Sequence, residues 1–143
     1  MKSKDVMTEK VVFCYPGDKV VKAAKKMKKA DIGSLPIVEN KENKKLTGIL
    51  TDRDLALKVI GKGRNPKSTK IKKVMTKNVV TCRTTDDVQK VLNMMAEHQL
   101  RRIPVVDKNN RVVGVIAQAD VATRLNQPSL TAAMVKDISQ SKK

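Results

Sequence analysis

The residues best suited to chemistry in this 143-residue chain are Thr51 and Asp54, which stand where an apolar stretch runs directly into a predicted helix. A Thr followed three positions later by Asp is typical of a capping box, in which both side chains satisfy backbone N–H groups left free at a helix start. The same turn directs free N–H groups and the positive end of the helix dipole outward, which suits a phosphate. Asp54 is placed to accept hydrogen bonds from both hydroxyls of a ribose. Two interpretations therefore stay open: a helix cap with no further role, or part of a nucleotide site.

The same pattern occurs again near the other end of the chain. Residues 114–120 repeat residues 48–54, with Asp120 in the place of Asp54 and Ala117 in the place of Thr51, so one hydroxyl is missing. A shift of 68 positions superimposes the parts before these stretches, and two extra residues in one turn reduce the shift to 66 afterwards. The chain thus contains an internal duplication of roughly 60 residues. Matching positions include Val6-Met7-Thr8 with Val74-Met75-Thr76, Cys14 with Cys82, Asp18 with Asp86, and Leu35-Pro36-Ile37-Val38 with Ile103-Pro104-Val105-Val106.

Each copy predicts the element order β-α-β-β-α. In the first copy a short strand is expected from Val11 to Cys14, and Asp18 is predicted to be the N-cap of the following helix. The apolar residues of this helix, from Val20 to Met27 and including Ala24, have the spacing of one buried face.

A hairpin and a second helix complete the copy. The apolar stretches Leu35 to Val38 and Leu46 to Leu50 are joined by a polar turn, as in two paired strands. The second helix is expected from about Asp52 to Ile60 and ends at Gly61, which is typical of a helix C-terminus.

The duplication also predicts the domain organisation. Residues 1–60 form the first repeat, residues 61–72 a basic linker, and residues 73–126 the second repeat. Residues 127–143 are expected to be a C-terminal helix and tail, with the short helix itself within residues 129–139.

Composition argues against several classes of protein. The chain has no run of about 18 apolar residues and its N-terminus lacks the apolar core of a signal peptide, so neither a membrane span nor a secretory signal is expected. Cys14 and Cys82 have no metal-binding spacing, and with one histidine no metal site is expected. Both cysteines are expected to be small buried hydrophobes of a reduced, cytoplasmic protein. No arrangement typical of nucleophilic or acid–base catalysis stands out, so the chain is not predicted to be an enzyme.

The formal net charge of +17 is the strongest compositional signal, and lysine supplies 24 of the 31 cations. Such a surface attracts nucleotides, nucleic acids or anionic membranes, or it serves only solubility. A lysine-rich nucleic-acid-binding protein is therefore the alternative hypothesis, with nucleotide control as a variant of it. One Phe, one Tyr and no Trp argue against aromatic stacking as a route to single-stranded nucleic acid.

Taken in order, these motifs resemble the CBS-domain family. Val-Met-Thr opens each copy, an apolar-Pro-apolar-apolar strand follows, and a glycine-led strand with an aspartate six positions later ends it; the resemblance covers about residues 5–125. It implies an α/β (α+β) fold of two tandem repeats, packed with pseudo-twofold symmetry into one Bateman module like those of stand-alone CBS-pair proteins. Such modules commonly bind adenosine-containing ligands in clefts between the repeats, and commonly form homodimers.

The resemblance implies a regulatory or sensor module without catalysis, cofactor or membrane attachment. Its expected ligand is an adenine nucleotide such as AMP, ADP or ATP, and its expected partners are a second copy of the chain and an unidentified regulated protein.

Carried over position by position, the resemblance predicts a first cleft in which Thr51 contacts phosphate and Asp54 contacts the ribose hydroxyls. Two valines would line the base, and Arg101 and Arg102 fall where the family often places phosphate-binding cations. Two guanidiniums beside a hydroxyl make a strong anion site. For the arginines, a solvated basic turn or an ion pair with Asp107 or Glu97 stays open as the alternative. The residues of this first site are Thr51, Asp54, Val79, Val80, Arg101, Arg102 and Pro104.

The second cleft departs from the family pattern. Asp120 keeps the ribose role, but Ala117 lacks the hydroxyl, and Gly33 and Ser34 stand where the first site has its arginines. Losing one charge-assisted contact costs roughly 1.5–3 kcal/mol, so this site is expected to bind weakly, to prefer an uncharged nucleoside, or to stay empty. Its residues are Val11, Val12, Ser34, Pro36 and Asp120.

Overall fold

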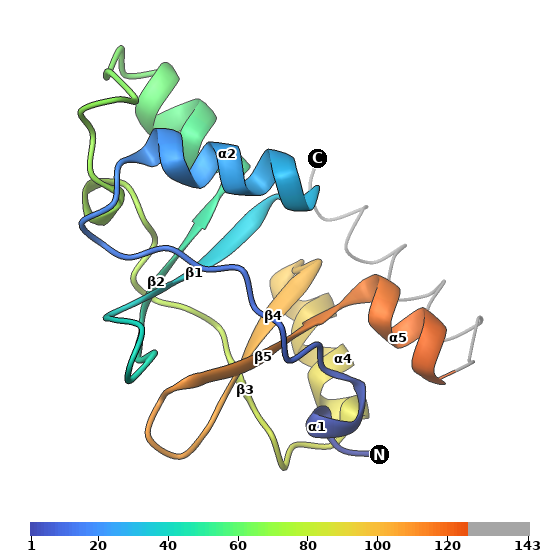
Figure 1. Cartoon of the computed structure of the whole chain (residues 1–143). Helices are drawn as coiled ribbons and strands as arrows, with labels where there is room; N and C mark the ends of the chain where they lie inside the picture. Colours follow the sequence, from blue (N-terminus) through green and yellow to red (C-terminus); the bar gives the residue numbers. More distant parts are fainter. Residues whose placement is uncertain (126–143) are drawn as a thin grey trace. The chain divides into compact units, whose positions relative to one another are not determined.

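The computed structural model of the chain describes residues 1–125, so the expected C-terminal helix within residues 129–139 lies outside the described residues (Figure 1). The chain forms two compact units. The central unit comprises Val12–Val79, and the terminal unit combines Met1–Val11 with the chain from Val80 onward.

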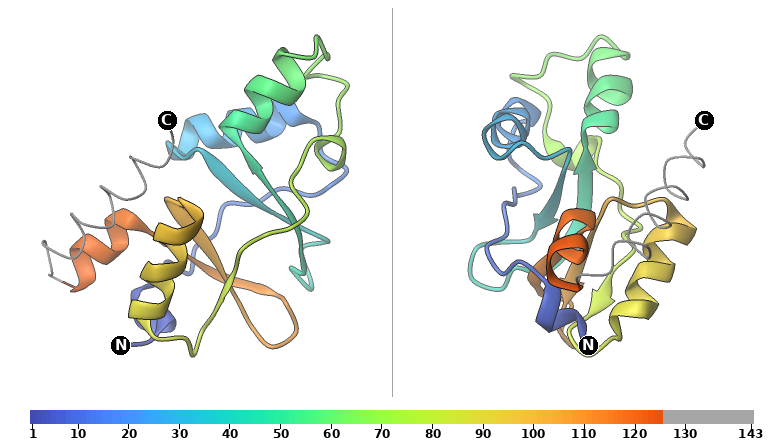
Figure 2. Two further views of the ribbon diagram at one scale, coloured as in Figure 1. Left: turned by 180° about the vertical axis from the view of Figure 1, so that it is seen from behind. Right: turned by 90° about the vertical axis from the view of Figure 1, so that its right-hand side faces the viewer.

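The central unit is built on an antiparallel hairpin of β1 (Ser34–Val38) and β2 (Leu46–Thr51). Helix α2 (Val20–Ala30) lies beside the helical segment formed by α3 (Asp52–Asp54) and the π-helix η1 (Leu55–Ile60), and a 3-10 turn, η2 (Ile71–Lys73), closes the unit (Figure 2). Apolar side chains from all these layers form one core, because each element places one apolar face inward. The buried residues of this core are Cys14, Val20, Ala23, Met27, Leu35, Ile37, Leu50, Val59, Ile71 and Val74.

The terminal unit also contains an antiparallel hairpin and a long helix, and its sheet has a third strand. Strand β3 (Cys82–Arg83) pairs in parallel with β4 (Arg102–Val106), and β4 pairs antiparallel with β5 (Val112–Ala117). Its helices are α4 (Val88–His98), α5 (Gln118–Leu125) and the short α1 (Ser3–Val6), which lies against α4, α5 and β5. The mixed α+β fold and the tandem repeats predicted from the sequence are confirmed.

The Val-Met-Thr segment that opens each copy packs on the hairpin of the other copy. Thr8 pairs through its backbone with Val115 in the terminal unit, and Thr76 pairs in the same way with Ile49 in the central unit. Each segment covers the outer edge of a hairpin, which would otherwise expose unpaired backbone groups. The opening residues of each repeat therefore belong to the compact unit that contains the hairpin of the other repeat.

This packing explains the glycine at the start of each repeated stretch. A Cβ atom at Gly48 would lie 2.7 Å from the Met75 sulfur and 2.9 Å from the Thr76 carbonyl oxygen. At Gly114 it would lie 2.6 Å from the Met7 sulfur. Only glycine lets the methionine and the covering backbone approach this closely.

Several local predictions are wrong in detail. Asp18 is not the N-cap of α2: that position is Lys19, and the Asp18 carboxylate instead accepts a hydrogen bond from the Tyr15 N–H at 3.0 Å, within the preceding turn. The predicted strand from Val11 to Cys14 is reduced to one bridge between Cys14 and Ile37. Ala24 is exposed, although its spacing placed it on the buried face.

The second helix ends at Ile60 with Gly61 as its C-cap, as expected, but the geometry of this end differs from a left-handed glycine cap. Its last turn is π-helical, with the Gly61 N–H donating to the Ala56 carbonyl at 2.8 Å. Gly61 has φ −63°, so no left-handed conformation requires a glycine here. The requirement is close backbone approach, because a Cβ at Gly61 would lie 2.9 Å from the Leu57 carbonyl oxygen. Among the described helices, none is both long and apolar enough to cross a membrane.

Candidate functional site

In the central unit, Thr51 and Asp54 form the capping box that their spacing predicts. The Thr51 hydroxyl accepts a hydrogen bond from the Asp54 N–H at 3.1 Å, and the Asp54 carboxylate accepts one from the Thr51 N–H at 3.0 Å. These reciprocal bonds fix the direction in which the chain leaves β2 and enters the helix. The helix-cap interpretation is confirmed.

The Asp54 carboxylate has a second partner that the sequence analysis missed. Its other oxygen lies 2.9 Å from the Lys58 ammonium, which also donates to the Val74 carbonyl at 3.1 Å. Asp54 is only 8% exposed, so this cation compensates a largely buried negative charge. The signal was available in the sequence, since Asp and Lys four residues apart share one helix face.

These contacts leave the carboxylate able to accept more hydrogen bonds. A carboxylate offers about four acceptor positions, and the contacts to the Thr51 N–H and to Lys58 use one on each oxygen of Asp54. Acceptor positions on this carboxylate therefore remain beyond those that the Thr51 N–H and Lys58 use. The arrangement is a rigid, charge-balanced acceptor at a helix start, which suits binding rather than proton transfer.

The opposite strand brings further predicted residues to the same hairpin. Ser34 is the register partner of Thr51, and Pro36 is the register partner of Ile49. Ser34 is half-buried and Pro36 is buried. Residues assigned to the two different sites, Ser34 and Thr51, thus face each other across one hairpin. Val12 and Val79, the first and last residues of the central unit, are both half-buried.

In the terminal unit, Asp120 is held by a different pair of groups. Its carboxylate accepts a hydrogen bond from the Ala117 N–H at 3.1 Å and another from the Thr8 hydroxyl at 3.2 Å. The first bond is the carboxylate half of the capping box seen at Asp54. The hydroxyl missing at Ala117 is replaced by one from the N-terminal segment, which donates to the carboxylate instead of accepting from the helix.

The two arginines predicted to bind phosphate lie beside this turn. Arg102 is the register partner of Ala117, and the Arg101 carbonyl accepts the Gln118 N–H at 3.1 Å. Arg101 is exposed and Arg102 half-buried. In the part of the chain that the structure describes, neither pairs with Asp107 or Glu97; Asp107 instead accepts backbone N–H groups from Asn109 and Arg111, at 2.8 and 3.0 Å.

The structure thus distributes the predicted residues over the two units. The central unit brings together Thr51, Asp54, Ser34 and Pro36, and also contains Val12 and Val79; the terminal unit brings together Arg101, Arg102, Pro104 and Asp120, and also contains Val11 and Val80. Each predicted site takes residues from both units, so the assignment of these residues to two shared sites stays a prediction.

The cysteines have the character of core residues. Burial raises the pKa of Cys14, and it raises the pKa of Cys82 to about 11, against an opposing hydrogen bond from the Ser3 hydroxyl. Both thiols therefore stay protonated and unreactive near neutral pH. Within residues 1–125, no group of three or more His, Cys, Asp and Glu side chains could hold a metal ion.

Comparisons with known proteins find the same duplication of the chain. A family model described as the CBS domain matches residues 4–61 and again residues 71–127. The uncharacterized protein YlbB of Bacillus subtilis is 39% identical over 139 residues, which cover 97% of this chain and 92% of that protein.

Two solved structures extend the comparison. The CBS domain pair of protein MJ0100, in complex with 5′-methylthioadenosine and S-adenosyl-L-methionine, is 30% identical with a TM-score of 0.75, over 90% of this chain and 98% of that one. Hypoxic Response Protein I, solved with two coordinated zinc ions, is 32% identical with a TM-score of 0.77, over 86% of this chain and 98% of that one. With both of its repeats matched by the family model and its fold shared by these structures, the chain belongs to the CBS-domain family.

Proposed function

We propose that this chain is a regulatory module that binds an adenosine-containing nucleotide and performs no catalysis. The observation that carries the proposal is the Thr51–Asp54 turn, where a rigid capping box holds a largely buried carboxylate at the start of a helix. The MJ0100 CBS domain pair, which is similar over nearly all of this chain, was solved with two adenosine-containing ligands.

In the proposed complex, Asp54 accepts hydrogen bonds from the ribose hydroxyls, and the Thr51 hydroxyl donates to a phosphate while it continues to cap the helix. Lys58 holds the Asp54 carboxylate in orientation, because its ammonium lies 2.9 Å away. Arg101 and Arg102 are proposed to supply the positive charge that further phosphates need. Bidentate contacts from guanidiniums favour phosphate over neutral groups.

Asp120 is proposed to form the weaker site. Its carboxylate already accepts the Thr8 hydroxyl, and Ala117 offers no hydroxyl to a phosphate. An uncharged nucleoside is therefore the better ligand there.

A thermal-shift panel of AMP, ADP, ATP, NAD, S-adenosylmethionine and 5′-methylthioadenosine tests the proposal on the full chain. A ligand at 100 times its Kd adds about 2.7 kcal/mol to the free energy of unfolding, so the best ligand should raise the Tm by several degrees. The Asp54→Asn variant keeps the backbone hydrogen bond of the cap but loses the charged acceptor, and should lose most of that shift. Asp120→Asn is the matched variant and should keep it.

Two results would contradict the proposal. One is the absence of a shift with every ligand in the panel, together with the absence of any small molecule released when the purified protein is denatured. The other is an equal loss of shift in the two variants, which would deny the difference between the two aspartates.

Self-association is proposed as the means by which ligand binding is read out, since a ligand acts only through its differential affinity for two states. In the central unit, η1 exposes Leu57 by 51% and Ile60 by 76%, and a second copy of the chain is proposed to cover them. Sedimentation of the wild-type chain should give a dimer, and the Ile60→Lys variant should shift it toward monomer. Unchanged sedimentation of that variant would exclude this interface.

Nucleic-acid binding is the second candidate function. The central unit contains 18 Lys and Arg against 6 Asp and Glu, a net charge of +12, whereas the terminal unit has 13 against 8, a net charge of +5. A charge so unevenly divided favours a polyanion-binding surface on one unit over general solubility. A nucleotide carries few charges, so attracting it does not require a net charge of +12 on one unit.

A further inference from the structure

Both aromatic residues of the chain lie together on the surface of the central unit. The rings of Phe13 and Tyr15 meet edge to face, with centroids 5.7 Å apart. Cys14, between them, is fully buried, whereas Phe13 and Tyr15 are both partly exposed. In extended chain alternate residues point to opposite sides. The two rings therefore share the outward side of this segment.

Lysines surround the pair. The Lys26 ammonium lies 5.8 Å from the centre of the Phe13 ring and donates to the Phe13 carbonyl at 2.7 Å, and the Lys44 ammonium lies 5.9 Å from the same ring. These are cation–π distances. They hold positive charge directly over aromatic surface.

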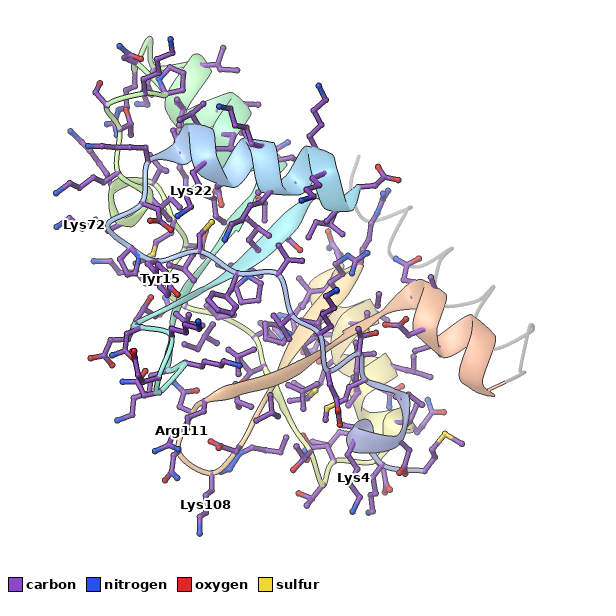
Figure 3. The ribbon with its side chains drawn as sticks, viewed as in Figure 1. Lys4, Tyr15, Lys22, Lys72, Lys108 and Arg111 are labelled. Carbon is purple, nitrogen blue, oxygen red and sulfur yellow. The ribbon has the colours of Figure 1, made fainter. Side chains whose placement is uncertain are left out.

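Two more lysines extend the charge along the same edge of the unit. Lys22 lies near Asp18, at 3.5 Å, and the Lys72 N–H donates to the Pro16 carbonyl at 3.0 Å. Figure 3 shows Tyr15, Lys22 and Lys72 along one side of the central unit. Asp18 is the acidic group on this surface, and its oxygens are engaged by Lys22 and the Tyr15 N–H. We call Phe13, Tyr15, Lys22, Lys26, Lys44 and Lys72 the basic aromatic surface.

The duplication supplies an internal control for this surface. At the positions of Phe13 and Tyr15 the second copy has Thr81 and Arg83, and at the position of Lys26 it has Met94. The terminal unit nevertheless forms the same hairpin and helix. The duplicated hairpin and helix therefore form in the terminal unit without an aromatic pair or its lysines, so these residues are not a general requirement of the fold.

We propose that the basic aromatic surface binds single-stranded nucleic acid. Ammonium groups contact successive phosphates without regard to sequence, and the partly exposed Tyr15 ring offers a stacking surface to any base that is not already paired. A duplex hides the faces of its bases and can satisfy only the lysines. From the sequence, a single Phe and a single Tyr argue against base stacking. In the structure, however, these two rings lie together within one cluster of lysines. The proposal uses none of the residues assigned to the nucleotide.

The chain offers a direct optical test. Tyr15 is the only tyrosine and the chain has no tryptophan, so its intrinsic emission reports on this surface alone. Titration of the full chain with an oligo(dT) of about ten nucleotides should quench that emission, because a base stacks on the ring. A duplex of equal length and inorganic polyphosphate should bind by charge and leave the emission unchanged. AMP, at concentrations that raise the Tm, should also leave it unchanged, which separates this test from that of the proposed function.

Variants locate the surface. Tyr15→Leu should weaken oligo(dT) binding roughly five- to 150-fold at fixed salt, while Tyr15→Phe, which keeps the ring, should bind nearly as the wild type. Lys44→Ala should lower the slope of log affinity against log salt concentration by about one. Lys108→Ala, the matched change in the β4–β5 turn of the terminal unit, should leave both affinity and slope unchanged.

Three outcomes would overturn the proposal. They are binding without quenching of Tyr15, equal effects of Lys44→Ala and Lys108→Ala, and wild-type affinity in Tyr15→Leu. Each would mean that the net positive charge attracts polyanions without a defined site. If Tyr15→Leu does not fold, the emission test on the wild-type chain and the lysine pair still decide.

Discussion

Asp54 and Asp120 occupy equivalent positions at the starts of two duplicated helices, but each carboxylate is supported by different groups. Asp54 accepts from the Thr51 N–H and pairs with Lys58, while Asp120 accepts from the Ala117 N–H and from the Thr8 hydroxyl. The backbone half of the cap is common to both turns. What differs is whether a cation on the same helix or a hydroxyl from another segment completes the carboxylate's partners.

This difference shows which parts of the turn the fold requires. The second copy has Ala117 at the position of Thr51, and its strand still runs directly into a helix. The Thr51 hydroxyl is therefore not needed to form such a turn, although it adds a cap to its own helix. Under the proposed function the Thr51 hydroxyl contacts the phosphate, whereas the Thr8 hydroxyl already donates to the Asp120 carboxylate.

The largest effect is expected when the two carboxylates are removed. Asp54→Ala leaves the Thr51 N–H without its acceptor and Lys58 without its partner, so we expect a loss of about 2–3 kcal/mol in the free energy of unfolding. Asp120→Ala removes two hydrogen bonds that uncharged donors make to the carboxylate, and should cost about 1–2 kcal/mol. Urea unfolding followed by far-ultraviolet circular dichroism measures both. A larger loss in Asp120→Ala would reverse the comparison.

The glycines should respond in the same order. Gly48→Ala places a Cβ atom 2.9 Å from the Thr76 carbonyl oxygen, whereas Gly114→Ala places it 3.1 Å from the Thr8 carbonyl oxygen. A methionine sulfur can move aside, but backbone cannot without breaking the bridge, so Gly48→Ala should cost about 2 kcal/mol and Gly114→Ala somewhat less. Gly17→Ala, where a Cβ meets nothing within 4 Å, is the control and should be neutral. Equal stability of all three variants would refute the close-approach explanation.

Features that depend on residues close together in the sequence could be predicted, whereas contacts between distant segments could not. The duplication, the hairpins and the Thr51–Asp54 cap follow from local patterns, and the structure confirms them. The exchange of the Val-Met-Thr segments did not follow, because periodicity shows that a segment is apolar but not which hairpin it covers. Asp18 is not the N-cap of α2, because a carboxylate before a helix can serve the preceding turn equally well.

Burial of the Cys82 thiol makes the free energy of unfolding depend on pH in the alkaline range. Burial raises the pKa of Cys82 from 9.0 to about 11, so the unfolded chain loses this proton before the folded chain does. The contribution to stability is fully present below pH 9 and is lost as the pH rises toward 11, by roughly 2 kcal/mol. Cys82→Ala should remove this part of the decline when compared with the wild type over the same pH range. A decline unchanged in Cys82→Ala would assign it to other groups, such as the lysines or Cys14.

The smallest effect separates the two Val-Met-Thr segments themselves. Thr8→Val keeps the shape of the side chain but removes the hydroxyl that donates to Asp120 at 3.2 Å, which should cost about 1 kcal/mol. Thr76→Val, the matched change, should be neutral because Thr76 is exposed and pairs with Ile49 through its backbone. Hydrogen exchange of the Ala117 amide should quicken in Thr8→Val, since its acceptor, the Asp120 carboxylate, is held less firmly. The Thr51 amide in Thr76→Val should exchange as in the wild type, and faster exchange there would mean that the two carboxylates depend on the covering segments alike.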